Sequence, residues 1–287
     1  MTRRFDVGIA SYSNFRALKQ TVDSIRARST TDWRLLIVDN PSDDPNVRPW
    51  IKQEADTDER IVYKFMDKNV GYAGAVNEIL NWAETEYIGY CDNDIIINTH
   101  GWDEEFCGLL DRHHEVGIVF PNVTAFPIHR GTYTEVMWGT GFCWAINRMA
   151  MKRTGLFDAE IGHQEEADYC LRIRMKGYRC ACLPDVKVKH AATASTDPKS
   201  LERINAGVER WVNKWNKYFN GEQYHYHHPC VTRWEDWPPN ALYLEGYYKK
   251  ILGEDFNADC ETVQLGGRKL DLIRVPRFFQ MYRGRII

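Results

Sequence analysis

The strongest constraint on the fold is an alternation of short apolar runs with amphipathic segments through the first half of the chain. Residues 6–10 have the composition of a buried strand, and residues 14–28 carry apolar side chains at helical spacing. Both patterns recur: strands are predicted at residues 34–38, 61–65, 87–91 and 117–120, and helices at residues 74–83 and 102–110. This alternation predicts an α/β fold with a mostly parallel, Rossmann-like central sheet flanked by helices.

The second half of the chain is less regular. Strands are predicted at residues 142–146 and 186–190, and helices at residues 167–176 and 201–219, which Gly177 and Gly221 end. Beyond Pro229 the chain is rich in Trp, Tyr and Pro and shows no clear period. We therefore predict one domain over residues 1–222 and a helical or irregular extension over residues 223–287.

Composition excludes several classes of protein. A net charge of −3 provides no global attraction to nucleic acid or anionic lipid, so any such contact must be local. No stretch is long and apolar enough to predict a membrane-spanning helix or a signal peptide. The eight cysteines are scattered without a C-x-x-C pair, which indicates free thiols in a reducing, cytoplasmic compartment.

Polar side chains directly follow three of the predicted strands. Ser11-Tyr12 follows the first strand, Asp39-Asn40 the second and Asp92-Asn93-Asp94 the fourth. In doubly wound sheets, ligands bind at the carboxyl ends of the strands. We therefore expect these three clusters to lie on one edge of the sheet.

Each cluster has a functional and a structural interpretation. Two carboxylates spaced as Asp92 and Asp94 can bind one divalent cation and leave positions for phosphate oxygens and water, but Asp and Asn also favour solvated turns. Asp39 could accept hydrogen bonds from a base or ribose, or it could cap a turn or a helix.

Three more features have the same two interpretations. Residues 69–77 resemble a glycine-rich phosphate loop that opens a helix, and a plain turn also explains them. Glu165, Glu166 and Asp168 precede or begin a predicted helix, where a carboxylate could act as a general base or complement the helix dipole. His190 ends a predicted strand and could bind a metal or be purely structural.

Taken in order, these segments resemble the family 2 glycosyltransferases of GT-A fold, especially the rhamnosyl- and galactofuranosyltransferase-like members. The resemblance covers residues 5–195. It rests on seven blocks, of which the first is Ser-Tyr after the opening strand. The others are V-D-N-x-S-x-D (38–44), N-x-G-x-A-G-A-x-N (69–77), D-N-D (92–94), G-T-G-F leading to G-L-F-D (139–158), E-E-x-D-x-C-L-R (165–172) and a His after the next strand.

The resemblance implies a role for each matching position. Asp39 would bind the uracil or thymine of a nucleoside-diphosphate sugar, bordered by Ser11 and Tyr12. Asp92 would touch the ribose or the metal, and Asp94 and His190 would ligate Mn²⁺ or Mg²⁺. Further donor contacts would come from Asn69, Gly71, Gly74, Asn77 and Asn93, and acceptor contacts from Trp138, Gly139 and Thr140.

The resemblance also implies an inverting mechanism in which a carboxylate is the base. Glu166 stands where the family usually has Asp, so Glu165 or Asp168 could share the role. Ala10 replaces a proline that is common in the family, which affects only the detail of the first loop. Glu166 would deprotonate the attacking acceptor hydroxyl while the cation neutralises the departing nucleoside diphosphate.

The C-terminal segment suggests the acceptor and the partners. Aromatic residues are interspersed with basic residues there, namely Arg268, Lys269, Arg274, Arg277, Arg283 and Arg285. Such a tail could rest on an anionic membrane and present a lipid-linked glycan, track a nucleic acid, or be solvated or contact another subunit. His225, His227 and His228 could bind a metal, but the interleaved Tyr224 and Tyr226 favour an aromatic surface or an acceptor wall.

Three other functions are alternatives to transfer of a sugar to a glycan. One is a non-catalytic module that binds nucleotide sugars or glycans, and another is a glycosyltransferase that acts on modified nucleic acid. A Rossmann-type dehydrogenase or methyltransferase is disfavoured because no G-x-G-x-x-G follows the first strand.

Overall fold

The computed structural model describes residues 4–121, 128–136, 138–191, nine helical residues between 202 and 214, and residues 260–265 and 268–273. The chain forms two compact units, Met1–Ser195 and Thr196–Ile287. The predicted domain boundary at residue 222 lies outside the described residues.

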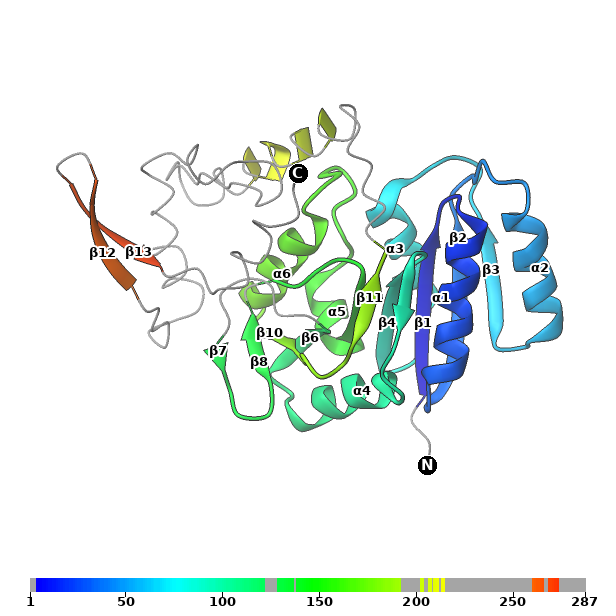
Figure 1. Cartoon of the computed structure of the whole chain (residues 1–287), viewed down its shortest axis with the longest axis horizontal. Coiled ribbons are helices and arrows are strands. Elements are labelled where there is room, and N and C mark those ends of the chain that lie inside the picture. Colours follow the sequence, from blue (N-terminus) through cyan, green and yellow to red (C-terminus); the bar gives the residue numbers. More distant parts are fainter. Residues whose placement is uncertain are drawn as a thin grey trace. The chain divides into compact units, whose positions relative to one another are not determined.

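A nine-stranded sheet forms the centre of the first unit, with the strand order β3-β2-β1-β4-β9-β6-β10-β8-β7 (Figure 1). Strand β1 is parallel to β2 and β4, β2 is parallel to β3, and β6 is parallel to β10; β9 is inserted antiparallel between β4 and β6. The predicted α/β fold with a mostly parallel sheet is confirmed. The strands are β1 (Arg4–Ser11), β2 (Asp32–Asp39), β3 (Ile61–Phe65), β4 (Tyr87–Asp92), β6 (Val116–Phe120), β7 (Ile128–His129), β8 (Thr134–Val136), β9 (Cys143–Asn147) and β10 (Arg179–Cys182).

Six helices accompany this sheet in the described part of the first unit: α1 (Phe15–Arg28), α2 (Val47–Thr57), α3 (Gly71–Trp82), α4 (Trp102–Arg112), α5 (Arg148–Thr154) and α6 (Glu165–Met175). The sequence predicted α1, α3, α4 and α6 but missed α2 and α5. Helix α2 buries only three residues and α5 only two, so neither shows a sustained apolar period.

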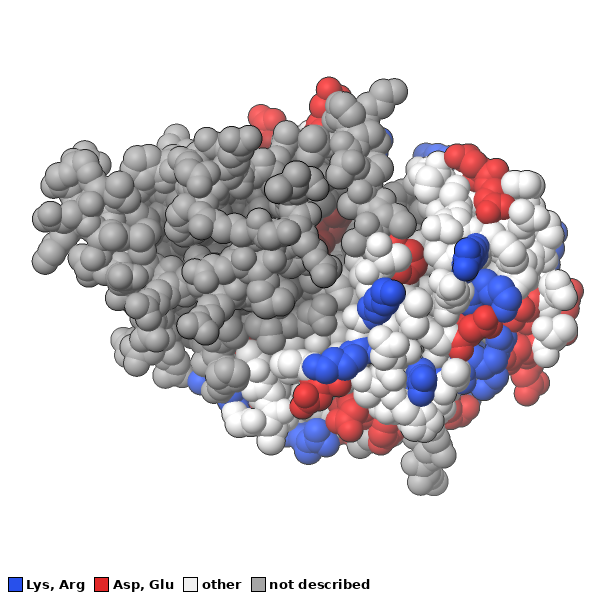
Figure 2. All heavy atoms as spheres, viewed as in Figure 1, with Lys and Arg blue, Asp and Glu red and all other residues white. Residues whose placement is uncertain are grey.

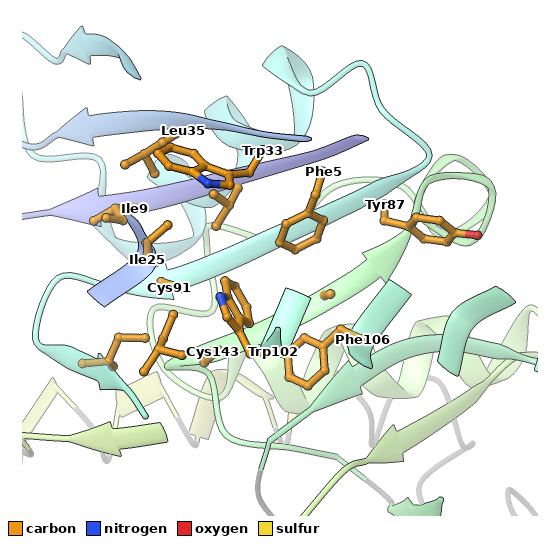
Figure 3. Close-up of a cluster of buried hydrophobic side chains, with 14 of the residues drawn as sticks. Phe5, Ile9, Ile25, Trp33, Leu35, Tyr87, Cys91, Trp102, Phe106 and Cys143 are labelled. Carbon is orange, nitrogen blue, oxygen red and sulfur yellow. The ribbon is translucent and has the colours of Figure 1, made fainter. Parts of the chain in front are cut away.

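Helices cover both faces of the sheet, and each face has its own apolar core. On one face, side chains of β1 and β2 pack against α1 and α4, and Trp102 meets Phe5 edge to face at 5.6 Å (Figure 3). On the other face, α3, α5 and α6 supply the core. There a Cβ on Gly8 would lie 2.3 Å from Ile79, so α3 packs directly on the backbone of β1.

A separate two-stranded sheet joins distant parts of the first unit. Strand β5 (Ile95–Ile97) pairs antiparallel with β11 (Val188–His190), and His190 lies opposite Ile95. The sequence predicted the second strand but not β5, because three residues are too few to show a period.

The described part of the second unit corrects one expectation. Strands β12 (Cys260–Leu265) and β13 (Arg268–Ile273) form an antiparallel hairpin where a helical or irregular extension was predicted. The signal was present as Gly266-Gly267 between two runs of suitable length. The nine described residues between 202 and 214 are helical, as predicted there.

No helix in the described part of the chain combines the length and the apolar character needed to cross a bilayer. Six cysteines are buried as free thiols, namely Cys91, Cys107, Cys143, Cys170, Cys180 and Cys182.

One buried carboxylate ties the first strand to its neighbours. Asp6 is fully buried and accepts hydrogen bonds from Arg34 Nε (2.8 Å) and Nη2 (3.0 Å) and from the backbone N–H groups of Glu84 (2.7 Å) and Thr85 (3.0 Å). Burial alone would raise the pKa of Asp6, but these donors outweigh it and the pKa lies below 3.8.

Replacing Asp6 with Asn is expected to destabilise the protein by about 3 kcal/mol at pH 7, because a buried ion pair loses one partner. The folded-state pKa of Asp6 is depressed, so its stabilisation is present above pH 3.8 and lost as the pH falls through the folded value. Urea unfolding should therefore show a smaller difference between the two proteins at pH 3 than at pH 7.

Asp32→Asn is the matched control, since Asp32 pairs with Arg4 in solvent. Its effect should stay within about 0.5 kcal/mol. A loss for Asp6→Asn no larger than that of the control would contradict the role given to Asp6.

Candidate active site

Three strand ends meet at one edge of the sheet, as expected. Ser11 pairs with Asp39 across β1 and β2, and Ala10 pairs with Asp92 across β1 and β4. The Asp92-Asn93-Asp94 segment turns from β4 into β5 at this edge. Asn93 Nδ2 bonds to the carbonyl oxygens of Tyr12 (3.3 Å) and Ser13 (3.2 Å), which links the turn to the loop after β1.

Asp92, Asp94 and His190 converge at this edge. His190 Nε2 lies 3.0 Å from Asp94 Oδ1 and 3.6 Å from Asp92 Oδ2. Potential ligand atoms of the three side chains all lie within 4.8 Å of one another. Two carboxylates and an imidazole at these distances could bind one divalent cation.

Helix α1 and strand β11 hold strand β5 from its two sides. On one side β11 brings His190, and the N–H of Ala191 donates to Asp94 O at 3.0 Å. On the other, the hydroxyl of Thr21 donates to Ile95 O (2.8 Å) and accepts from Ile95 N–H (3.1 Å), and Ser24 Oγ accepts from Ile97 N–H (3.1 Å). The short strand is thereby bonded on both edges.

The electrostatics of the cluster favour a cation. Burial raises the pKa of Asp92 to about 6; Tyr90 and His190 oppose this shift and the charge of Asp94 adds to it. Burial lowers the pKa of His190, but Asp94 and Asp92 outweigh it, so the net pKa lies above 6.5. A divalent ion would stabilise both carboxylates in their charged form.

The predicted acid cluster begins α6. Glu166 is partly exposed, and removal from water, the charge of Glu165 and the charge of Asp92 raise its pKa to about 8. Asp168 is fully buried and pairs with Arg172 Nε at 2.8 Å on the same helix. Of these two carboxylates, Glu166 is therefore the one suited to accept a proton from a substrate.

The segment of residues 138–142 lies beside both Glu166 and the Asp-Asp-His cluster. Phe142 O accepts from Asp92 N–H at 2.7 Å, and the Phe142 ring stacks on His190 at 4.8 Å. A Cβ on Gly141 would lie 3.4 Å from both Glu166 Oε2 and the Tyr72 hydroxyl. One short segment thus touches both the candidate base and the candidate metal ligands.

The other residues of this segment are tightly placed. A Cβ on Gly139 would lie 2.0 Å from the ring of Phe120, so only glycine fits there. Thr140 Oγ1 is buried and has no hydrogen-bond partner among the described residues. Trp138 is partly buried against the apolar core on the sheet face that α3, α5 and α6 cover.

Asp39 is fully buried beneath the loop after β2. It accepts from Ser42 Oγ at 2.5 Å and from Arg48 Nε at 2.7 Å. Each carboxylate oxygen keeps one acceptor position, but because Asp39 is fully covered, a donor base could reach it only if the side chain of Ser42 or Arg48 moved. Next to it, Ser11 Oγ is buried without a hydrogen-bond partner among the described residues, and the Tyr12 hydroxyl lies 3.3 Å from Asp43.

The glycine-rich segment, residues 69–77, makes contacts that fix its own backbone and that of its neighbours. Gly71 has φ +72°, which favours glycine, and a Cβ on Gly74 would lie 2.8 Å from Val70. Asn69 Oδ1 accepts from Gly71 N–H at 2.9 Å. Asn77 uses both ends of its amide on the backbone of Phe157, at 2.8 and 2.9 Å. These contacts favour a positioning role for Asn77 over a direct donor contact.

Several residues near this edge have backbone angles that side chains other than glycine rarely adopt. Among the described residues the non-glycine residues with positive φ are Ser13, Asn14 and Gln164. The first two lie in the loop after β1, and Gln164 caps the helix that carries Glu166. Such outliers are often held at functional sites.

Several side chains that shape the site were not predicted from the sequence, namely Thr21, Ser24, Arg48, Tyr72 and Tyr90. They lie inside helices and strands as ordinary members of an apolar or polar pattern, and no motif marks them. Only the fold brings them to the strand ends.

Of the features predicted in the C-terminal segment, Arg268 and Lys269 begin β13, whereas His225, His227, His228 and the basic residues after 273 lie outside the described residues. On the face in Figure 2, Lys and Arg side chains of the described part are interspersed with Asp and Glu. The described part of that face therefore shows no continuous basic track of the kind that binds nucleic acid.

Residues 6–165 match the sequence model of the glycosyl transferase family 2. An uncharacterised protein of Sinorhizobium fredii, y4gI, is 24% identical over 148 residues, 50% of this chain and 16% of that protein. TuaG of Bacillus subtilis, provisionally named a teichuronic acid biosynthesis glycosyltransferase, is 33% identical over 84 residues, 29% of this chain and 33% of that protein. The matches thus span a third or less of these relatives.

Solved structures share the fold at low identity. The mannosyltransferase PcManGT of Pyrobaculum calidifontis, in complex with GDP-Man and Mn²⁺, matches with a TM-score of 0.62 and 19% identity over 77% of this chain and 65% of its own. GalNAc-T7 with UDP, GalNAc and Mn²⁺ matches with a TM-score of 0.62 and 13% identity over 76% of this chain and 50% of its own. Residues 1–349 of S. aureus TarS, in complex with UDP, match with a TM-score of 0.55 and 14% identity over 81% of this chain and 76% of that structure.

Proposed function

The chain belongs to glycosyl transferase family 2 and has its GT-A fold, and we propose that it transfers a sugar from a nucleoside-diphosphate donor to an acceptor hydroxyl with inversion. The single observation that carries the proposal is the convergence of Asp92, Asp94 and His190 at the sheet edge that also holds Asp39 and Ser11. Glu166 interacts electrostatically with the same cluster.

The three side chains fit a divalent cation. Carboxylate oxygens suit Mg²⁺ and Mn²⁺ alike, whereas an imidazole nitrogen favours a transition metal, so Mn²⁺ is the better match. Asp92, Asp94 and His190 would hold the ion. When bound, it supplies positive charge to the leaving diphosphate.

Glu166 is the proposed base. Its carboxylate accepts the proton of the acceptor hydroxyl as that oxygen attacks the anomeric carbon from the face opposite the leaving group. A raised pKa makes a carboxylate a stronger base, and the value of about 8 is close to neutral pH. Alignment of the two substrates supplies much of the remaining rate enhancement.

Asp39 and Ser11 form the proposed base pocket of the donor. One of the two remaining acceptor positions on Asp39 suits the N3–H of uracil or thymine once the covering side chain of Ser42 or Arg48 moves, and the buried hydroxyl of Ser11 offers a further hydrogen bond. UDP or dTDP sugars are the proposed donors. GDP sugars are the alternative to test, because PcManGT was solved with GDP-Man.

The proposed acceptor is a glycan, free or linked to lipid. Trp138, Gly139 and Thr140 would border it, because their segment lies beside Glu166. We propose that residues 1–222 form the catalytic domain of a cytoplasmic enzyme. The extension of residues 223–287 would contact the acceptor, a membrane or another subunit.

The donor site can be tested by thermal shift with UDP, dTDP and GDP sugars, each with and without Mn²⁺. At a hundred times its Kd, the right donor should raise Tm by roughly 5–10 °C, and only with Mn²⁺. Asp94→Ala should abolish this shift, whereas Asp56→Ala, an exposed acid on α2, should keep it. An Mn²⁺-dependent shift that survives in Asp94→Ala would overturn the metal site.

The base can be tested by Glu166→Gln, which should leave the donor-dependent thermal shift intact while kcat falls roughly 10²–10⁴-fold. In the unmodified enzyme kcat/KM should rise with pH as Glu166 loses its proton. That limb should lie well above pH 4.5 and no higher than about 8, because a nearby cation lowers the pKa.

Glu160→Gln, an exposed acid that precedes the same helix, is the control and should keep both the rate and the pH profile. Full transferase activity in Glu166→Gln, or an unchanged pH limb, would contradict the assignment of the base.

A further inference from the structure

Tyr90 lies directly beneath the candidate metal ligands. It is fully buried in β4, two residues before Asp92, so both side chains project from the same face of the sheet. The Tyr90 hydroxyl donates to Asp92 Oδ1 at 2.6 Å. This is a short hydrogen bond to a carboxylate, of the strong class.

That bond distinguishes the two oxygens of Asp92. Oδ1 is engaged by Tyr90, while Oδ2 is the atom 3.6 Å from His190 Nε2. The terminal torsion of an aspartate is soft and lets the carboxylate rotate freely when nothing holds it. The hydroxyl therefore decides which oxygen faces Asp94 and His190, and in which direction.

The tyrosine ring is itself held rigidly. It stacks on Trp144 with ring centroids 5.2 Å apart, and Tyr72 meets it edge to face at 5.3 Å. Trp144 in turn stacks on Phe157 at 5.7 Å. A ring clamped on two sides places its hydroxyl within a narrow range.

We propose that Tyr90 is a positioning residue that orients Asp92 for the divalent cation. The inference rests on the proposed function, since it concerns the same metal site. Tyr90 acts through Asp92 and touches neither substrate nor ion. Residues that orient a metal ligand in this way typically change metal affinity 10–100-fold when they are lost.

The test is Tyr90→Phe, which removes the hydroxyl and keeps the ring in its stack. Mn²⁺ binding is measured calorimetrically, and by the electron paramagnetic resonance signal of free Mn²⁺, without donor or acceptor. We expect the Kd for Mn²⁺ to rise at least tenfold. In turnover assays the Mn²⁺ concentration for half-maximal rate should rise alike, while kcat at saturating Mn²⁺ changes much less.

Tyr169→Phe is the matched control. Tyr169 belongs to the same group of stacked rings, against Phe157 at 4.1 Å, but its hydroxyl donates to Gly155 O at 3.0 Å. Both variants lose one partly buried hydrogen bond, so both should lower the metal-free Tm, and Tyr90→Phe should lower it more because its bond is to a carboxylate. The Kd of Tyr169→Phe for Mn²⁺ should stay within twofold of the unmodified protein.

Three results would overturn the inference. If the Kd of Tyr90→Phe for Mn²⁺ stays within twofold of that of the unmodified protein, the role of Tyr90 is wrong, but the proposed metal site is unaffected. An equal loss in Tyr169→Phe shows that packing, not the bond to Asp92, sets the affinity. Absence of Mn²⁺ binding in the unmodified protein removes the proposed metal site and the role of Tyr90 together.

Discussion

The proposed chemistry depends on how one three-residue strand is held. Strand β5 is bonded to β11 on one edge and to the hydroxyls of Thr21 and Ser24 on the other. Unpaired backbone groups are costly when buried, so this double pairing keeps β5 in one register. Because Asp94 directly precedes β5 and His190 ends β11, the register brings together two side chains that are far apart in the sequence.

A second constraint couples the metal ligands to the proposed base. Residues 138–142 lie beside both: Phe142 bonds to Asp92 and stacks on His190, and Gly141 packs beside Glu166. The close approach at Gly139 and the hydrogen bond from Tyr72 to Gly141 O, 3.1 Å, hold this segment in place. In the proposed mechanism, one piece of backbone would therefore organise both proton acceptance and binding of the leaving group.

Periodicity predicted the elements that bury a sustained apolar face, such as α1 and β1, and the rule for strand ends placed Ser11, Asp39 and Asp92 on one edge. It missed α2, α5, β5, β7, β8 and β10, which are short or bury few residues. Tyr90 and Arg48 were missed for another reason: their importance lies in a partner, Asp92 or Asp39, that only tertiary packing supplies. Asn77 matched a motif, yet its amide serves the backbone of Phe157.

The proposed function requires that the Asp-Asp-His cluster holds one ion while a nucleoside diphosphate is bound at the same edge. The most direct measurement is a crystal structure with Mn²⁺ and the nucleoside diphosphate that stabilises the protein most, with the ion located by its anomalous scattering. We predict one peak coordinated by Asp92, Asp94, His190 and the diphosphate, with the base of the nucleotide at Asp39. A nucleotide bound there with no ion on these side chains, or an ion held elsewhere, would contradict the account.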